Sequence, residues 1–416
     1  MRRLQTMVRM AVSALVLVLF VRTFLAEGLL TRFVVSGASM SPALHGAHFV
    51  LRCPECATAF CVETEEEARP LPNELPLRWG TCPACSFAQV PVPADAWRPG
   101  DRIWVNRAAV SLRAIRRWDA VLFRSPEDGR LTVKRIVGLP GETLEIRDGD
   151  IFINGQIAVK SLAVQRAMRI PVLYGRWEMQ PGRVDETYEL AYHPIRNVPH
   201  NSQLTTRNSQ LSGVTNQLCE NQWRIEPPNS IYPVRDLMLE FDWQPDDNMP
   251  LCVRAMTCNL QLPMPLAAKQ NGTHKVEISL FDRRLLVTVD GVIMVEKPLD
   301  HESQQSTDGY PFAFSLSENS GRPQSEHEAA IKRQVTNLRV WRDVYYMSGF
   351  GLQTSGFRKS PAERVPKPEV RSPKPESIPV GCYYVLGDNS SFSSDSRHWH
   401  KPFVAHRDLI GIVTAL

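Results

Sequence analysis

The chemistry in this chain could begin at Ser39, in the run Ser36 to Leu44, which reads Ser-Gly-Ala-Ser-Met-Ser-Pro-Ala-Leu. A serine hydroxyl is a weak nucleophile at neutral pH, so it needs a base within hydrogen-bond reach and neighbours small enough to admit a substrate carbonyl. Gly37 and Ala38 are such neighbours. A glycine and serine cluster is equally typical of an ordinary turn. The rest of the chain must decide between a nucleophile and a turn.

A candidate base is Lys134, which lies in the strand-like apolar run Leu131 to Val137. If its side chain faces solvent, it is an ordinary charged surface residue. If it faces the interior, the loss of hydration lowers its pKa from about 10.4 towards neutrality. Only the second orientation would make it a usable base, and the residues of the strand leave both orientations open.

Four of the nine cysteines form two Cys-x-x-Cys pairs, Cys53 with Cys56 and Cys82 with Cys85. Two such pairs can place four thiolates tetrahedrally around one Zn²⁺, each pair in a tight turn, as in a zinc ribbon. Two local disulfides or four free thiols are the alternative in an oxidising compartment. A disulfide across so short a turn would be strained, which favours metal. Since all four ligands would be protein sulfur, the expected zinc is structural.

The N-terminus is basic and is followed by an apolar run from Met10 to Val21. A run this short suits the core of a cleaved signal peptide, but no convincing small-x-small cleavage site follows. A helix from Met7 to Phe24, with Arg22 snorkelling, would be roughly 27 Å long and nearly cross a bilayer core. We therefore expect an uncleaved transmembrane anchor over residues 1–30, with a cytoplasmic N-terminus by the positive-inside rule.

The remainder of the chain predicts a mainly β protein. Residues 195–222 are rich in Asn, Gln, Ser and Thr and predict a surface loop. Short strand-like runs with turn signals and no helical periodicity predict a β-sandwich within residues 161–350. Residues 351–379 are rich in proline and charge, and predict an extended linker. From residue 380 onwards, apolar runs such as Tyr383 to Leu386 and Leu409 to Thr414 again predict strands.

Composition limits the classes of function. The 416 residues are 43% hydrophobic, which is enough for two or three domains with proper cores. The net charge of +4 is small for this length, and Lys and Arg are spread along the chain. A nucleic-acid partner is therefore not expected.

Taken in order, four segments resemble the bacterial type I signal peptidases, which are membrane-anchored serine proteases with a Ser-Lys dyad. Ala43 stands where threonine is usual, Trp118 replaces a glycine, and residues 390–392 depart from the usual types. The resemblance covers roughly residues 1–52, 95–157 and 380–416. The four segments are Gly37 to Pro42, Arg117 to Phe123, Lys134 to Glu142, and Gly387 to Arg397.

The resemblance implies an antiparallel β catalytic domain in which Ser39 attacks the scissile carbonyl and a neutral Lys134 takes its proton. Catalysis by such a dyad needs no cofactor. Ser393 matches the position whose hydroxyl orients the lysine, and Asp395 with Arg397 matches a structural ion pair near the site. The oxyanion would be held by the backbone N–H of Ser39. Some family members add a serine hydroxyl where this chain has Gly37, and Ser36, one residue earlier, is a possible substitute. His398 and His400 would be surface residues.

The expected domains are an anchor (1–30), a catalytic domain in three parts (31–52, 95–160 and 380–416), a zinc-ribbon insert (53–94), a β-sandwich insert (161–350) and a linker (351–379). The sandwich loosely resembles lectin-like jelly rolls. Four of its aromatic residues could stack on sugars, although such residues are more often core: Trp243, Trp341, Tyr345 and Tyr346.

The implied function is a membrane-bound signal peptidase I on the outer, periplasmic side of the inner membrane. Its substrates would be exported preproteins, bound as extended strands and cleaved after a small residue. A self-cleaving repressor-type Ser-Lys protease would need a helical DNA-binding module, and the chain has an apolar segment instead. The rival from another class is a membrane-tethered binding protein, with a degenerate protease core and a sandwich that binds glycan or protein.

Overall fold

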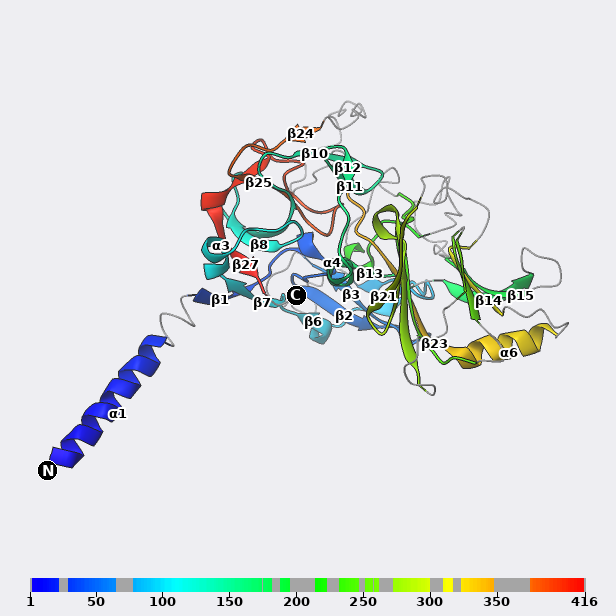
Figure 1. Cartoon of the computed structure of the whole chain (residues 1–416), viewed down its shortest axis with the longest axis horizontal. Helices are drawn as coiled ribbons and strands as arrows, with labels where there is room; N and C mark the ends of the chain where they lie inside the picture. Colours follow the sequence, from blue (N-terminus) through cyan, green and yellow to red (C-terminus); the bar gives the residue numbers. More distant parts are fainter. Residues whose placement is uncertain are drawn as a thin grey trace.

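The computed structural model confirms a mainly β protein built from antiparallel sheets (Figure 1). Most of the predicted linker, residues 351–374, lies outside the described residues. The end of that stretch is not a linker, because β24 (Glu376–Ser377) pairs with β10 (Thr143–Arg147) and Ile378 is buried. The structure describes residues 2–21, 29–64, 78–173, 175–181, 188–194, 214–222, 232–246, 251–256, 258–261, 272–299, 310–316, 323–347 and 375–414.

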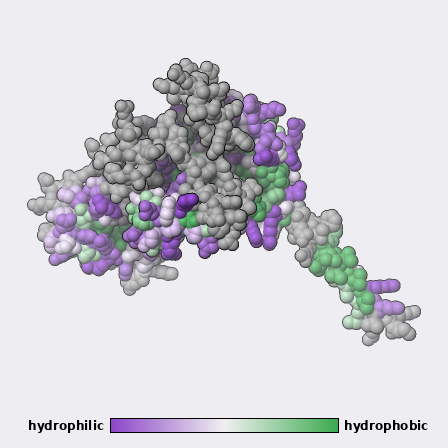
Figure 2. All heavy atoms as spheres, turned by 180° about the vertical axis from the view of Figure 1, so that it is seen from behind, coloured by the Kyte–Doolittle hydropathy of each residue, from purple (hydrophilic) through white to green (hydrophobic). Residues whose placement is uncertain are grey.

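The N-terminal helix α1 (Arg2–Phe20) stands away from the rest of the molecule (Figure 1). Its apolar side chains are exposed and form a continuous hydrophobic surface (Figure 2). In the described part of the chain, no helix is both long and apolar enough to cross a bilayer, so the predicted transmembrane span is not found. Residues 22–28, which include the end of the predicted Met7 to Phe24 helix, lie outside the described residues.

The domain that the resemblance implies to be catalytic is built around two sheets, which we call the catalytic sheets, and their strands come from distant parts of the chain. A seven-stranded sheet has the order β1 (Leu30–Val34), β7 (Arg102–Asn106), β27 (Leu409–Val413), β8 (Ala120–Arg124), β9 (Leu131–Gly138), β25 (Cys382–Leu386) and β26 (Phe403–Ala405). The helix α3 (Ala108–Leu112) follows β7. A four-stranded sheet has the order β12 (Gln156–Ile157), β11 (Asp150–Ile153), β10 (Thr143–Arg147) and β24.

The four paired cysteines belong to a small unit that we call the four-cysteine module, made of the described residues between 48 and 98. Its three-stranded sheet has the order β3 (Ala59–Glu63), β2 (His48–Arg52) and β6 (Trp97–Arg98). Its two-stranded sheet pairs β4 (Trp79–Gly80) with β5 (Val90–Pro91). Phe49, Phe60 and Val62 pack with Cys53 and Cys82 in one buried cluster.

The remaining strands form two sheets that share one hydrophobic core. Alternate residues of β16 point into that core and meet Val253 and Phe314 of the other sheet. One sheet has the order β13 (Ile170–Pro171), β23 (Val335–Arg342), β16 (Leu237–Trp243), β19 (His274–Ser279), β20 (Arg284–Val289) and β21 (Val292–Pro298). The other has the order β14 (Arg176–Pro181), β15 (Tyr188–His193), β22 (Phe312–Leu316), β17 (Leu251–Ala255) and β18 (Cys258–Gln261).

Among the described residues, two helices accompany these sheets, although the sequence pattern suggested none. Helix α4 (Leu162–Met168) is capped by the Ser161 side chain, and α6 (Gln324–Gln334) buries Ile331 against the core. Trp243 and Tyr346 are buried, as aromatic residues of a core are, while Trp341 and Tyr345 are partly exposed.

Candidate active site

The candidate nucleophile Ser39 lies in a single 3-10 turn, η2 (Ala38–Met40), shortly after β1. Met40 is buried and anchors this turn in a hydrophobic cluster with Val35 and Leu44. Gly37 is extended and exposed, and a Cβ added to it would meet no atom within 4 Å. Open space therefore lies beside Gly37, two residues before Ser39, which is itself half-buried.

The candidate base Lys134 faces the interior, because its side chain is only 2% exposed within β9. Strand β9 packs against η2, which brings the two candidate residues into the same region. Burial lowers the pKa of Lys134 to about 8, and the negative charge of Asp395 only partly offsets this effect. Of the two orientations that the sequence left open, the structure shows the desolvated one.

The segment that follows β25 lies directly against the candidate nucleophile. The backbone N–H of Asn389 donates to the Ser39 carbonyl oxygen at 3.1 Å, and its Nδ2 donates to the Ala38 carbonyl oxygen at 3.0 Å. A Cβ on Gly387 would lie 2.3 Å from the Ser39 carbonyl oxygen and 2.2 Å from Ser393 Oγ. Only glycine fits at position 387, so the first and fourth resembling segments meet there in direct backbone contact.

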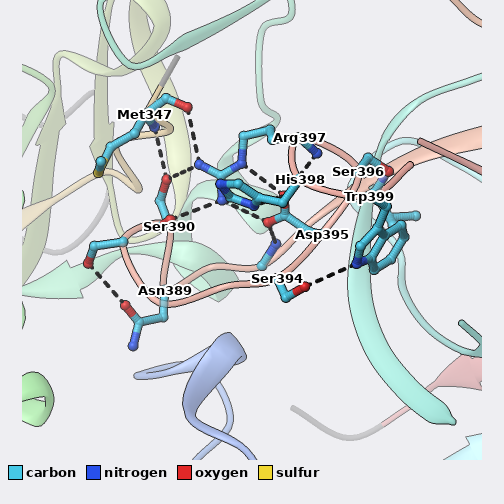
Figure 3. A network of polar contacts seen from close by, with 12 residues as sticks. Met347, Asn389, Ser390, Ser394, Asp395, Ser396, Arg397, His398 and Trp399 are labelled. Carbon is cyan, nitrogen blue, oxygen red and sulfur yellow. Dashed lines mark hydrogen bonds and ion pairs between the residues drawn. The ribbon is translucent and has the colours of Figure 1, made fainter. Parts of the chain in front are cut away.

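Asp395 and Arg397 form a buried ion pair that holds this segment in place (Figure 3). Arg397 Nε lies 2.9 Å from Asp395 Oδ1, and Asp395 Oδ2 accepts from the Gly387 N–H at 3.0 Å. Burial alone would raise the pKa of Asp395, but the charge and hydrogen bonds of Arg397 outweigh it and lower that pKa to about 2. Arg397 also donates to Ser390 Oγ and to the Met347 carbonyl oxygen, so it ties the segment to the chain beyond β23.

A second buried ion pair joins Arg135 to Asp388, with Nε and Oδ1 2.8 Å apart. Arg135 Nη1 also donates to the Trp118 carbonyl oxygen at 2.8 Å, so this pair links three of the four resembling segments. Trp118 has φ 74°, a left-handed backbone that favours glycine, which explains the glycine expected at this position from the resemblance. Here the buried Trp118 ring packs in the core and meets the Lys160 ammonium at 4.8 Å.

Ser393 is buried, and its Oγ has no hydrogen-bond partner among the described residues. An unpaired buried hydroxyl beside Gly387 is available for a lysine side chain, and its orienting role stays a prediction. Ser36 is exposed, and its role at the oxyanion also stays a prediction. His400 lies at the surface as expected. The expectation for His398 was wrong, because its side chain is 6% exposed and its Nδ1 lies 3.6 Å from Asp395 Oδ1.

The sequence reasoning also missed residues that support η2. The loop predicted for residues 195–222 ends in a buried turn, η4 (Cys219–Asn221), and Asn221 pairs with Asn389. Ser41, two residues after Ser39, donates a hydrogen bond to Glu63. Both pairs join residues far apart in the chain, so no local sequence pattern predicts them.

The four cysteines come together as their spacing predicts. All four Sγ atoms lie within 4.8 Å of one another, with Cys53 and Cys85 at 3.5 Å and Cys56 and Cys82 at 3.5 Å. All are free thiols. Sulfur ligands about 2.3 Å from a zinc ion in a tetrahedron are about 3.8 Å apart, so the residues fit such an ion.

The turns that carry the cysteines have the same form. The N–H of Ala57 donates to the Cys53 carbonyl oxygen, and the N–H of Ser86 donates to the Cys82 carbonyl oxygen. Ala57 has φ 58° and Ser86 has φ 63°, so both turns close through a left-handed residue. This repetition is typical of paired metal-binding turns.

Comparison with known proteins identifies the family. The profile described as "Signal peptidase, peptidase S26" matches residues 90–210 and 287–416, which include Lys134 and Gly387 to Arg397 but not Ser39. Signal peptidase I V of Bacillus subtilis (strain 168) is 37% identical over 60 residues, covering 14% of this chain and 35% of that protein. Signal peptidase I of Leptolyngbya laminosa is 30% identical over 77 residues, covering 16% of this chain and 38% of that protein.

The chain thus spans about a third of the length of these curated relatives. The profile match is much longer, and it includes the strands that hold Lys134 and the segment that lies against η2. The chain belongs to the signal peptidase family, peptidase S26.

Proposed function

We propose that this protein is a signal peptidase I, a serine endopeptidase that removes signal peptides from exported preproteins with a Ser39–Lys134 dyad. The observation that carries the proposal is Lys134, a lysine buried in an apolar strand with its pKa lowered to about 8. At pH 7 roughly one such lysine in ten is neutral, against fewer than one in a thousand for an exposed lysine. A neutral amine next to a serine is what this chemistry requires.

In the proposed reaction, Lys134 Nζ accepts the proton of Ser39 Oγ as that oxygen attacks the scissile carbonyl. The backbone N–H of Ser39 stabilises the oxyanion. The Lys134 ammonium then protonates the leaving amine, and the same lysine activates the water that hydrolyses the acyl-enzyme. The unpaired Ser393 hydroxyl supports a role in orienting Lys134, and the ion pair of Asp395 and Arg397 keeps Gly387 against Ser39.

Membership of the family supports a proposal for the substrate and the location. An extended signal peptide would enter the open space beside Gly37 and pair by main-chain hydrogen bonds. The exposed apolar side chains of α1 support association with membrane lipid, which would place enzyme and preprotein on one surface (Figure 2). The catalytic domain would act on the outer, periplasmic side, where exported preproteins emerge.

The test is cleavage of a purified preprotein by the full chain and by Ser39→Ala. We expect Ser39→Ala to abolish cleavage, and we expect kcat/KM of the wild type to rise with pH up to about 8 as Lys134 loses its proton. The matched control is Ser325→Ala, an exposed serine on α6. Undiminished cleavage by Ser39→Ala would contradict the dyad and favour the rival binding protein with a degenerate protease core.

We also propose that Cys53, Cys56, Cys82 and Cys85 bind one structural zinc ion, while catalysis needs no cofactor. The ion would supply cross-linking between the two turns and no reaction step, because all four ligands are protein sulfur. We expect one zinc per purified chain by elemental analysis, and loss of both the zinc and the local fold in Cys82→Ser. Cys252→Ser, at a half-buried cysteine of β17, is the matched control. Purified protein with disulfides and no metal would refute this.

A further inference from the structure

The loop that carries Ser39 is held from outside the catalytic sheets at two places. The first is Glu63, the last residue of β3 in the four-cysteine module. Its Oε1 accepts from Ser41 Oγ and lies 2.8 Å from His45 Nδ1. Ser41 and Glu63 are both fully buried. Because β3 pairs with β2 across the turn that contains Cys53 and Cys56, the position of Glu63 depends on the first cysteine turn.

The second place is the pair of amides Asn221 and Asn389. Asn221 Nδ2 donates to Asn389 Oδ1 at 3.1 Å, and Asn389 Nδ2 donates to Asn221 Oδ1 at 2.8 Å. Asn389 is also the residue that donates to the carbonyl oxygens of Ala38 and Ser39. Asn221 is 2% exposed and Asn389 is fully buried, so neither amide can exchange its partner for solvent.

The turn η4 that carries Asn221 is itself attached to the four-cysteine module. Gln222 Oε1 accepts from the Thr81 N–H at 2.6 Å, and Gln222 Nε2 donates to the Thr81 carbonyl oxygen at 2.7 Å. Thr81 immediately precedes Cys82. Cys219, at the start of η4, packs against the buried cluster of the module. The second cysteine turn is therefore connected through η4 to Asn389 and the backbone of Ser39.

We propose that the four-cysteine module and η4 together brace the nucleophile, and that Glu63 and Asn221 are positioning residues for Ser39. This inference rests on the proposed function of Ser39. Each cysteine turn has its own route to the loop, one through Glu63 to Ser41 and one through Gln222 and Asn221 to Asn389. The brace acts on the rate of the chemical step, because a displacement of about 1 Å of a reacting group can cost roughly 100-fold in rate.

The decisive variant is Asn221→Ala, assayed for kcat and KM on a preprotein. Asn221 is too buried to touch a substrate, so we expect kcat to fall roughly tenfold while KM stays unchanged. Glu63→Gln should act in the same direction. Gln324→Ala, at an exposed amide on α6, is the matched control and should equal the wild type.

A double variant separates positioning from a general loss of stability. If Asn221 acts through Asn389, Asn221→Ala combined with Asn389→Ala should be no slower than Asn389→Ala alone. Additive losses would overturn the brace. If Asn221→Ala does not fold, Gln222→Ala removes only the link to Thr81 and should lower kcat several-fold at unchanged KM and zinc content.

Wild-type kcat in both Asn221→Ala and Gln222→Ala, or a change confined to KM, would also overturn the brace. Those results would leave the proposed function intact as long as cleavage still requires Ser39. Conversely, cleavage that survives Ser39→Ala would refute the proposed function, whatever the Asn221 variants do.

Discussion

Two lysines are buried in the described part of the chain, Lys134 and Lys160, and their surroundings shift their pKa values in opposite directions. Lys134, in the candidate active site, lies in an apolar strand, and burial lowers its pKa to about 8. Lys160 follows β12, and its Nζ binds Asp282, which lies between β19 and β20, and also Asp343, the latter at 2.7 Å. Burial acts against its charge as well, but the two carboxylates raise its pKa well above the usual value. Burial creates a base only where no carboxylate makes direct contact with the amine.

The largest effect on activity is expected from Lys134→Met, which removes the candidate base. Loss of the base should reduce kcat by about 10³-fold or more. The same change should stabilise the fold by about 2 to 3 kcal/mol at pH 7, because the pKa is lowered from 10.5 to about 8 and the ammonium is therefore costly to bury. The cost of burying the ammonium is complete well below pH 8. It decreases as pH rises through the folded pKa of about 8, and it disappears above the pKa of Lys134 in the unfolded chain.

Activity and the denaturant midpoint of Lys134→Met should be measured on the same preparation. Lys401→Met, at an exposed lysine of the catalytic domain, is the matched control. A variant that loses activity because it is less stable would show that Lys134 is a structural cation like Lys160.

Lys160→Met should have the opposite effects, with a large loss of stability and little change in kcat. Removal of the cation leaves Asp282 and Asp343 buried without their partner, which should destabilise the fold by about 3 to 5 kcal/mol. The kcat of the remaining folded protein should be close to that of the wild type, because Lys160 lies outside the candidate active site. Chemical denaturation gives the stability, and Lys275→Met, at a half-exposed lysine of β19, is the control. If Lys134→Met and Lys160→Met changed kcat and the free energy of unfolding equally, the two buried lysines would not differ in role.

The sequence could predict the mainly β fold and single out the candidate site residues because these signals are local. Ser39, Lys134 and the Asp395–Arg397 pair lie in short runs whose residue types are fixed by close packing, as at Gly387. The residues around Lys160 could not be predicted in this way. Asp282 and Asp343 are 122 and 183 residues from Lys160, and neither lies in a recognisable motif. The sequence around each aspartate predicts an exposed carboxylate, whereas both are buried in the folded protein.

The same limit explains the error at η4, whereas the span predicted at α1 is not found among the described residues. The polar composition before residue 222 predicts a solvated loop, yet Asn221 satisfies its amide against Asn389 and is buried. A polar side chain with a polar partner can enter the interior, and only the fold shows the partner. At α1 the predicted span depends on a hydropathy pattern that continues into residues 22–28, which lie outside the described residues, and the helix itself ends at Phe20.

The smallest effect concerns Asp150, which faces the same cluster as Lys160 and lines a cavity of about 320 Å³. Burial raises the pKa of Asp150 to about 7, and the charges of Asp282 and Asp343 add to this shift while Lys160 opposes it. The folded protein therefore holds a proton that the unfolded chain releases near pH 4. Stability from this group is complete below the unfolded pKa and is lost as pH rises through about 7.

Asp150→Asn should remove that loss. From pH 6 to pH 8 the free energy of unfolding of the wild type should therefore fall by about 1 kcal/mol relative to that of the variant. The measurement is the denaturant midpoint at both pH values. Asp148→Asn, at an exposed residue of the same hairpin, should leave the pH dependence unchanged. The two lysines then lie in regions with opposite responses to pH, since rising pH neutralises Lys134 in the candidate active site and charges Asp150 beside Lys160. Equal changes of the midpoint from pH 6 to pH 8 in the wild type and in Asp150→Asn would contradict the raised pKa of Asp150.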